Sequence, residues 1–199
     1  DDVDTHSMVR AQQQHPGGAA LGHGLPQLGE RRHVGRGSRE EAEVLAEELP
    51  GGVSASVIAL RVPATGRGIV VKQALPRLRV ADEWLATQER AETEVDAMRL
   101  CASITPGAVP RVLASDPAAH ILALELIEGC ANWQAEVAEG RVHAATGAWA
   151  GTTLGAWHAA TSGRADVVER FGDLEAFEQL RLRPFHETVM ARLPELAPA

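Results

Sequence analysis

The part of the chain that decides the fold reads VSASVIALRV at residues 53–62, PATGRG at 63–68 and IVVK at 69–72. The first and third segments are rich in β-branched and other apolar residues, whereas the middle one holds a proline and two glycines. Two such runs joined by turn residues predict a β-hairpin. The hairpin ends at Lys72, the only lysine among the 19 Lys and Arg residues. Lysine is a compact charge on a thin stem, which suits a phosphate contact inside a cleft; the alternative is a surface lysine at a strand end.

The segments around the hairpin predict further elements. Residues 39–49 have the composition of a helix, which Pro50 and the two following glycines would end. After the hairpin, apolar residues at helical spacing predict a helix over 88–103. Residues 109–114 read as a short strand, and 121–127 form the most apolar strand, which we expect near the centre of a sheet.

The second half of the chain has a helical character. Residues 129–140 read as a connector, 143–161 as a helix, and 174–193 as a helical stretch interrupted at Pro184. Glycines recur every fourth residue in the 143–161 helix, a stripe that would let another helix approach closely: Gly147, Gly151 and Gly155. Strands followed by helices predict an α+β architecture, with two sub-lobes that meet near Gly129.

Composition excludes several classes of protein. The chain carries 27 acidic against 19 basic residues, a net charge of −8, which argues against binding nucleic acid through a basic surface. No apolar run approaches the length of a membrane span, and the start of the sequence is acidic and polar, so neither a membrane segment nor a secretory signal is expected. Two cysteines without a Cys-x-x-Cys spacing indicate free thiols and a cytoplasmic location.

Three features around Lys72 favour a phosphate site. Gly51 and Gly52 precede Ser54 in the turn before the hairpin, where glycines let backbone N–H groups approach an anion. Glu94 lies at the edge of the helix face that packs on the sheet, from which it could reach Lys72, although a solvated glutamate is the alternative. The segment 124–127 ends the apolar strand near the meeting point of the sub-lobes, where backbone groups could read a purine edge.

This series of a glycine-containing hairpin, Val70-Val71-Lys72, a helix with Glu94 and the linker 124–127 resembles the N-terminal lobe of kinase-like folds. More narrowly, it is similar to the aminoglycoside phosphotransferase / methylthioribose kinase-like superfamily, above all in the block KQALP at 72–76. The segment 154–161 resembles the helix that follows the linker in such kinases. The resemblance covers about residues 45–199.

The resemblance implies a fold and a set of roles. It implies a nucleotide-binding lobe at 39–128 and a linker with a partial helical lobe at 129–199. Residues 1–38 have few aliphatic residues and no hydrophobic period, so we expect a poorly ordered tail there. The resemblance also implies a strand rather than a helix at 45–49. The nucleotide is expected to be ATP. The turn with Gly51, Gly52 and Ser54 would cover its phosphates, and Lys72, with Glu94 as its partner, would hold the α- and β-phosphates. The backbone of Glu125 and Ile127 would bind adenine.

The sequence departs from the family in one respect. The family's catalytic loop, His-Gly-Asp-x-x-x-x-Asn, and its later Asp supply the base and the Mg²⁺ ligands, and this chain contains no such loop. We therefore expect a truncated phosphotransferase of small-molecule alcohols such as sugars or amino alcohols, with little or no activity of its own. One alternative is a non-catalytic module that binds a nucleotide or a partner. Another is an unstable product whose exposed apolar helices aggregate or form homodimers.

Overall fold

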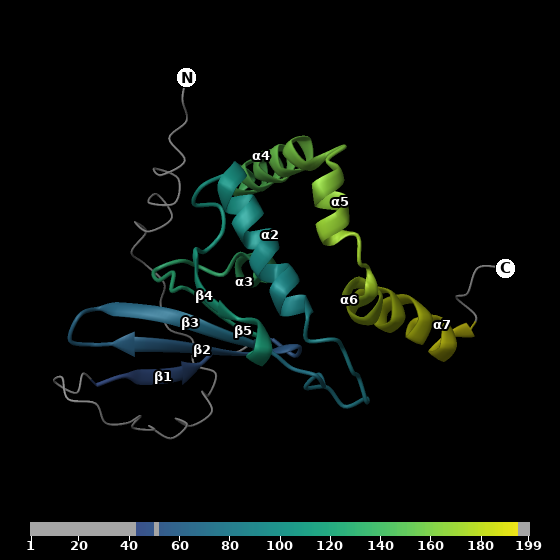
Figure 1. Ribbon diagram of the computed structural model, residues 1–199, viewed down its shortest axis with the longest axis horizontal. Coiled ribbons are helices and arrows are strands. Elements are labelled where there is room, and N and C mark those ends of the chain that lie inside the picture. Colours follow the sequence, from purple (N-terminus) through teal and green to yellow (C-terminus); the bar gives the residue numbers. More distant parts are fainter. Residues whose placement is uncertain (1–42, 50–51, 195–199) are drawn as a thin grey trace.

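A computed structural model describes residues 43–49 and 52–194. The described chain is α+β: a five-stranded antiparallel sheet with one long helix against it, followed by a series of helices (Figure 1). The expected tail at 1–38 and the expected phosphate contact Gly51 lie outside the described residues. In the described part of the chain, no helix has both the length and the apolar composition needed to cross a membrane.

The sheet has the strand order β1-β2-β3-β5-β4, and all neighbouring strands are antiparallel. The predicted hairpin is confirmed: its first strand begins two residues later than predicted, and its second strand extends beyond 69–72 at both ends. The apolar strand β5 is an interior strand with a partner on each side, although the middle of the sheet is β3. The strand bounds are β1 Leu45–Glu48, β2 Ala55–Val62, β3 Arg67–Ala74, β4 Val112–Asp116 and β5 Ile121–Glu125.

The segment from residue 45 to 48 is a strand, as the family resemblance implied, and not the helix that its composition favours. All four of its residues are exposed at the edge of the sheet, where they pair with β2. Two ion pairs hold this edge: Glu47 with Arg61 at 2.7 Å, and Glu48 with Arg79 at 2.5 Å. Backbone pairing with an existing hairpin thus outweighs a helix propensity that is worth a few tenths of a kcal/mol per residue.

Helix α2 (Arg90–Ile104) confirms the predicted helix and covers one face of the sheet. Because cross-strand partners share a face, the pairs Val70–Leu124 and Lys72–Leu122 point their side chains to the side that α2 covers. The core between sheet and helix is small, and Leu122 is 1% exposed at its centre. Its members are Ala74, Ala91, Val95, Leu122 and Leu124, with Val70, Met98 and Val112 at its margin.

The segment after β5 packs closely on the start of β3. A Cβ on Gly68 would lie 2.5 Å from the Leu126 side chain and 3.0 Å from the carbonyl oxygen of Leu60. Only a residue without a side chain leaves room for Leu126 here. Gly68 therefore fixes how the chain leaves the sheet toward the helices.

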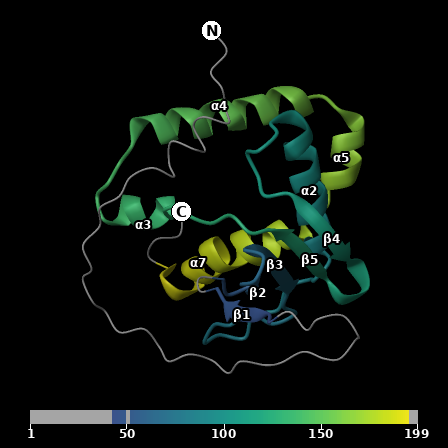
Figure 2. The same cartoon turned by 90° about the vertical axis from the view of Figure 1, so that its left-hand side faces the viewer.

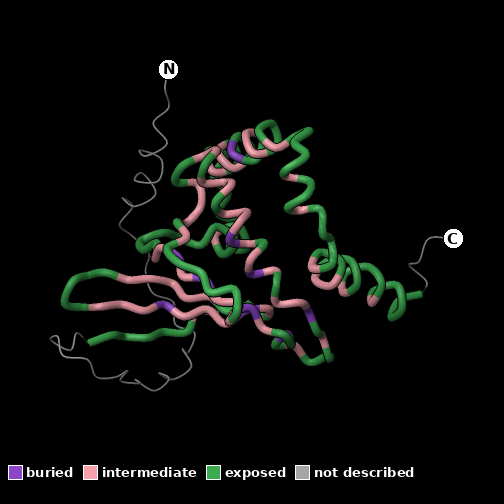
Figure 3. The backbone as a smooth tube through the Cα atoms, in the orientation of Figure 1, coloured by how far each residue is buried: buried purple, intermediate pink, exposed green. Residues whose placement is uncertain are grey.

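The helices after the sheet touch α2 through few contacts. Trp157 of α4 donates its indole N–H to the hydroxyl of Thr105 at 2.6 Å, and Arg170 of α5 pairs with Asp96 of α2. Figure 2 shows α4 running across the end of α2, away from the sheet. Thr153 is the only buried residue of the described helices after α2, and Figure 3 shows these helices almost entirely exposed or intermediate. Their bounds are α3 Trp133–Ala138, α4 Ala144–Thr161, α5 Ala165–Phe171, α6 Glu175–Phe177, the π-helical segment η2 Glu178–Glu187, and α7 Thr188–Arg192.

Three expectations for this half need correction. The connector at 129–140 contains the short helix α3, which begins after Asn132 because the Asn132 side chain accepts the N–H of Ala135. The helical stretch near the C-terminus is not interrupted at Pro184. It passes through this residue as a π-helix, whose wider turns leave room for the proline ring. Among residues 43–49 and 52–194, no helix packs on the glycine stripe of α4: a Cβ at Gly147, like one at the other two glycines, would meet nothing within 4 Å.

The helical segment Glu175–Arg192 is called the C-terminal helix below. It returns to the loop between β3 and α2, which makes three polar contacts with it. The indole N–H of Trp84 donates to the carbonyl oxygen of Gln179 at 2.8 Å, and the N–H of Thr87 donates to the Gln179 side chain at 2.8 Å. Asp82 and Arg192 form an ion pair at 2.7 Å. A segment distant in sequence is thereby held beside the end of β3.

Candidate functional site

The candidate site is centred on the ion pair between Lys72 and Glu94. Lys72 lies on β3 between Val70 and Ala74, on the face of the sheet that α2 covers. Its ammonium group donates to both carboxylate oxygens of Glu94, at 2.6 and 2.7 Å. The two side chains are 29% and 34% exposed, so the pair is shielded from water on most sides but remains accessible. The sequence predicted that Glu94 could reach Lys72, and the structure has this contact.

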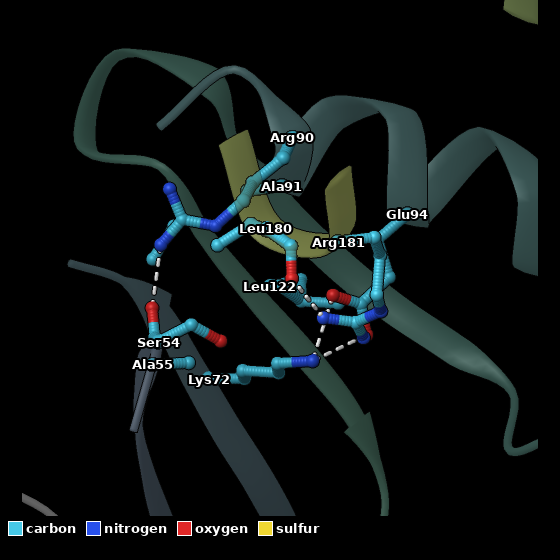
Figure 4. A pocket seen from close by; sticks show the side chains of 10 residues that line it. Ser54, Ala55, Lys72, Arg90, Ala91, Glu94, Leu122, Leu180 and Arg181 are labelled. Carbon is cyan, nitrogen blue, oxygen red and sulfur yellow. Dashed lines mark hydrogen bonds and ion pairs between the residues drawn. The ribbon is translucent and has the colours of Figure 1, made fainter. Parts of the chain in front are cut away.

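A pocket of about 220 Å³ lies over this ion pair (Figure 4). Its floor is apolar and comes from strands β2, β3 and β5, whereas its walls carry charge. Three cations and one carboxylate face it, which leaves two positive charges in excess. The residues around it are Ser54, Ala55, Lys72, Ala74, Arg90, Ala91, Glu94, Leu122, Leu180 and Arg181.

Arg90 fixes the turn before β2 relative to the rest of the site. Its guanidinium donates to the carbonyl oxygens of Ser54 at 2.5 Å and Leu75 at 2.8 Å, and also to those of Ala86 and Thr87. Burial lowers the pKa of Arg90 below its usual value, because the charge is partly removed from water. Four carbonyl partners compensate for that loss of hydration. Arg90 is therefore a structural clamp that joins the turn, the end of β3 and the start of α2.

The expected phosphate-binding turn is described only from residue 52 onward. Gly52 is exposed and lies two residues before Ser54, which borders the pocket. The carbonyl oxygen of Ser54 accepts the N–H of Leu75 at 3.0 Å in addition to Arg90. The structure thus brings Ser54, Lys72 and Glu94 together.

The expected adenine contacts, Glu125 and Ile127, do not line this pocket. The N–H of Glu125 donates to the carbonyl oxygen of Arg111 at 2.9 Å, which engages it in the sheet. The Glu125 carboxylate pairs with the Arg111 guanidinium at 3.1 Å, and this contact lowers the pKa of the glutamate. Ile127 is 49% exposed beyond the end of β5.

Two cationic residues of the pocket were not predicted from the sequence. Arg90 lies four residues before Glu94, so both occupy one face of α2, and this spacing was a usable signal. Arg181 reaches the pocket from the C-terminal helix. No local pattern in the sequence connects Arg181 with Lys72, because the contact depends on how the helix returns to the sheet.

The described residues do not fit a magnesium site. They include no group of three or more His, Cys, Asp or Glu side chains that could hold a metal ion. The one carboxylate in the pocket, Glu94, already accepts two hydrogen bonds from Lys72. Magnesium favours several oxygen ligands in an octahedral arrangement, and the donors on these walls are mainly cationic.

Comparisons with known proteins point to one kind of enzyme. The chain is 36% identical over 88 residues to methylthioribose kinase of Geobacillus thermodenitrificans, which covers 44% of this chain and 22% of that protein. It is 45% identical over 62 residues to the methylthioribose kinase of Geobacillus sp. strain WCH70, which covers 31% of this chain and 16% of that protein. It is 30% identical over 110 residues to that of Pectobacterium atrosepticum, which covers 55% of this chain and 28% of that protein. The matches thus span less than a third of each relative. No protein-family model matches the chain.

These similarities are partial: they relate short stretches of the chain to methylthioribose kinases. The antiparallel sheet with α2 against it is compatible with the N-terminal lobe of a kinase-like fold.

Proposed function

We propose that this chain is the nucleotide-binding part of an ATP-dependent small-molecule kinase. The observation that carries the proposal is the ion pair between Lys72 and Glu94 beneath a pocket with excess positive charge. A lysine held in this way from a β-strand by a helix glutamate is the device that protein kinases use to position the α- and β-phosphates of ATP. The partial similarity to methylthioribose kinases supports the same assignment.

The proposed roles of Lys72 and Glu94 follow the geometry of the site, and the other roles follow the family resemblance. Lys72 binds the phosphate chain, and Glu94 holds the ammonium group in place. The turn with Gly51, Gly52 and Ser54 covers the phosphates, and the backbone near Glu125 and Ile127 binds adenine. The sheet with α2 is the nucleotide-binding lobe, and the helices from residue 129 onward begin a second lobe.

The proposed acceptor is the hydroxyl group of a small sugar or amino alcohol, with methylthioribose as the first compound to test. The phosphoryl transfer itself needs a base and magnesium ligands. The described residues do not supply the metal ligands, so we assign the chemical step to no residue of this chain. We expect little or no turnover by the 199-residue chain alone.

The test is a titration of the chain with ATP by isothermal calorimetry. Replacement of Lys72 by alanine should abolish measurable binding while the protein stays folded, because a half-exposed ion pair contributes only about 1 kcal/mol to stability. The matched control is Arg67→Ala, which removes an exposed cation from the other end of β3 and should leave binding unchanged. If Lys72→Ala binds ATP as the unchanged protein does, the proposal is wrong. If the variant unfolds, as judged by circular dichroism, Lys72 is a structural residue.

A second candidate function is a module that binds a nucleotide without catalysis. The observation in its favour is the donor set of the pocket, which holds three cations and a single, already paired carboxylate. Such a module should bind ATP with nearly the same affinity in Mg²⁺ and in EDTA. ATP-dependent phosphorylation of methylthioribose or another small alcohol by this chain would exclude it.

A further inference from the structure

The C-terminal helix contributes a wall to the pocket that faces Lys72. Leu180 and Arg181 of η2 line the pocket opposite the sheet. Figure 4 shows the Arg181 side chain directed toward the same space as the Lys72 ammonium group and the Glu94 carboxylate. A segment far along the chain therefore adds a second cationic side chain beside the proposed phosphate site.

The hydrogen bonds of the three cations distinguish their roles. Lys72 donates twice to Glu94, which neutralises its charge. Arg90 uses four hydrogen bonds on backbone carbonyls and is fully engaged in holding the turn. Arg181 donates once, to the carbonyl oxygen of Leu180 at 2.8 Å, and it forms no ion pair with the carboxylates of residues 43–49 and 52–194. A guanidinium has five N–H donors, so Arg181 keeps most of its capacity for a bound anion.

The position of Arg181 is set before any ligand arrives. Gln179 lies two residues before Arg181. Its carbonyl oxygen accepts the indole N–H of Trp84 and its side chain accepts the N–H of Thr87, at 2.8 Å each. These bonds fix η2 against the loop that follows β3, and thus fix the direction of the next turn of the helix. The backbone that carries the exposed Arg181 side chain is thus already in place, which lowers the ordering cost of binding.

The size and charge of the pocket indicate the ligand. The lining of the pocket carries two excess positive charges in a chain whose net charge is −8, and such clustering is unfavourable unless an anion compensates it. The volume of about 220 Å³ is below the roughly 300–1,000 Å³ of pockets that enclose complete drug-sized ligands. A chain of phosphate groups meets both conditions, whereas a complete nucleotide would extend beyond the pocket.

We infer that Arg181 is a second phosphate-contacting residue, and that the C-terminal helix closes the pocket over the polyphosphate chain of the ligand. This inference deepens the proposed nucleotide site and rests on it for the identity of the nucleotide. Arginine suits this role because its planar fork can bind two phosphate oxygens at once.

The experiment titrates the 199-residue chain with inorganic tripolyphosphate, ATP and adenosine by isothermal calorimetry at low and moderate salt. The variant is Arg181→Gln, with Arg181→Lys as a second variant that keeps the charge. The matched control is Arg183→Gln, on the same helix, where Arg183 does not line the pocket and pairs with Glu178 at 3.9 Å. Circular dichroism monitors the fold of each variant.

We expect Arg181→Gln to weaken tripolyphosphate and ATP binding about tenfold, as the loss of a charge-assisted contact predicts. Arg181→Lys should recover part of the loss, and Arg183→Gln should change binding less than about twofold because its charge is exposed. Adenosine binding should not respond to any of these changes.

If Arg181→Gln binds tripolyphosphate as the unchanged chain does, the inference about Arg181 is wrong. This holds even if Lys72→Ala no longer binds ATP. If binding of tripolyphosphate depends on Arg181 but ATP binds no more tightly than tripolyphosphate, the anion site is supported and the proposed nucleotide function is wrong. If the unchanged chain binds neither ligand, both fail.

Discussion

Replacement of Arg90 by methionine should destabilise the protein strongly, although the residue lies at the margin of the core. Methionine keeps much of the length and apolar character of the side chain while it removes the guanidinium. The change deprives four carbonyl oxygens of a charged donor, namely those of Ser54, Leu75, Ala86 and Thr87. The Ser54 carbonyl keeps one bond, from the N–H of Leu75.

The size of the effect follows from those bonds. A hydrogen bond to a charged group contributes about 1.5–3 kcal/mol net when it is buried. Arg90 is only half-buried, so water can replace part of each bond in the variant. We therefore expect a loss of about 2–4 kcal/mol for the set, against a total stability of about 5–15 kcal/mol for a domain. At about 2–4 °C per kcal/mol, the melting temperature should fall by roughly 5–15 °C.

The assay is thermal unfolding monitored by circular dichroism, with urea unfolding as a second measurement of the free energy. Arg99→Met is the matched control, because Arg99 is exposed on the same helix, and we expect a change of less than about 0.5 kcal/mol. Arg90→Lys should also be destabilised, because a compact ammonium group cannot reach all the carbonyl oxygens that the planar guanidinium contacts. A melting temperature of Arg90→Met within about 2 °C of the unchanged protein would refute the role of Arg90 as a clamp.

Two further predictions concern glycine positions and pH. Gly68→Ala should destabilise the protein by about 1–3 kcal/mol in urea unfolding, because its Cβ would lie 3.0 Å from the carbonyl oxygen of Leu60. Gly147→Ala on α4, where a Cβ meets nothing within 4 Å, should instead stabilise it by about 0.5–1 kcal/mol, and an equal response of the two variants would contradict this assignment. Arg111 lowers the pKa of Glu125 below 4.5, so this carboxylate contributes stability above that pH and loses it as the pH falls through the lowered pKa of the folded state. Glu125→Gln should therefore flatten the decline of melting temperature below about pH 4.5, and a decline as steep as that of the unchanged protein would argue against the pair.

Several elements could be predicted from the sequence because their signals are local. The hairpin from Ala55 to Ala74 follows from two β-rich runs and a turn with proline and glycine. Helix α2 follows from its apolar spacing and from the residues that end it. Lys72 stood out because it is the only lysine, and the spacing of α2 indicated that Glu94 could approach it. The hairpin and the helix need only neighbours a few positions apart, whereas the rarity of lysine is a count over the whole chain.

Other features depended on contacts between distant segments. The residues from Leu45 to Glu48 favour a helix by composition, but they form a strand because the edge of β2 offers backbone partners. The glycines of α4 suggested a close helix contact, yet a glycine stripe shows only that a helix could approach and not that one does. These outcomes are set by which surfaces meet, which local propensity does not encode.

The charge of the candidate site shows the same division. The sequence by itself determined that a lysine would lie on the second hairpin strand and that a glutamate would follow on the next helix. Only the tertiary structure decided that Arg181 faces them, because η2 is positioned by the bonds of Gln179 to Trp84 and Thr87. Helix period and strand alternation act over a few residues. The electrostatic character of a pocket, in contrast, is the sum over every segment that the fold brings to its walls.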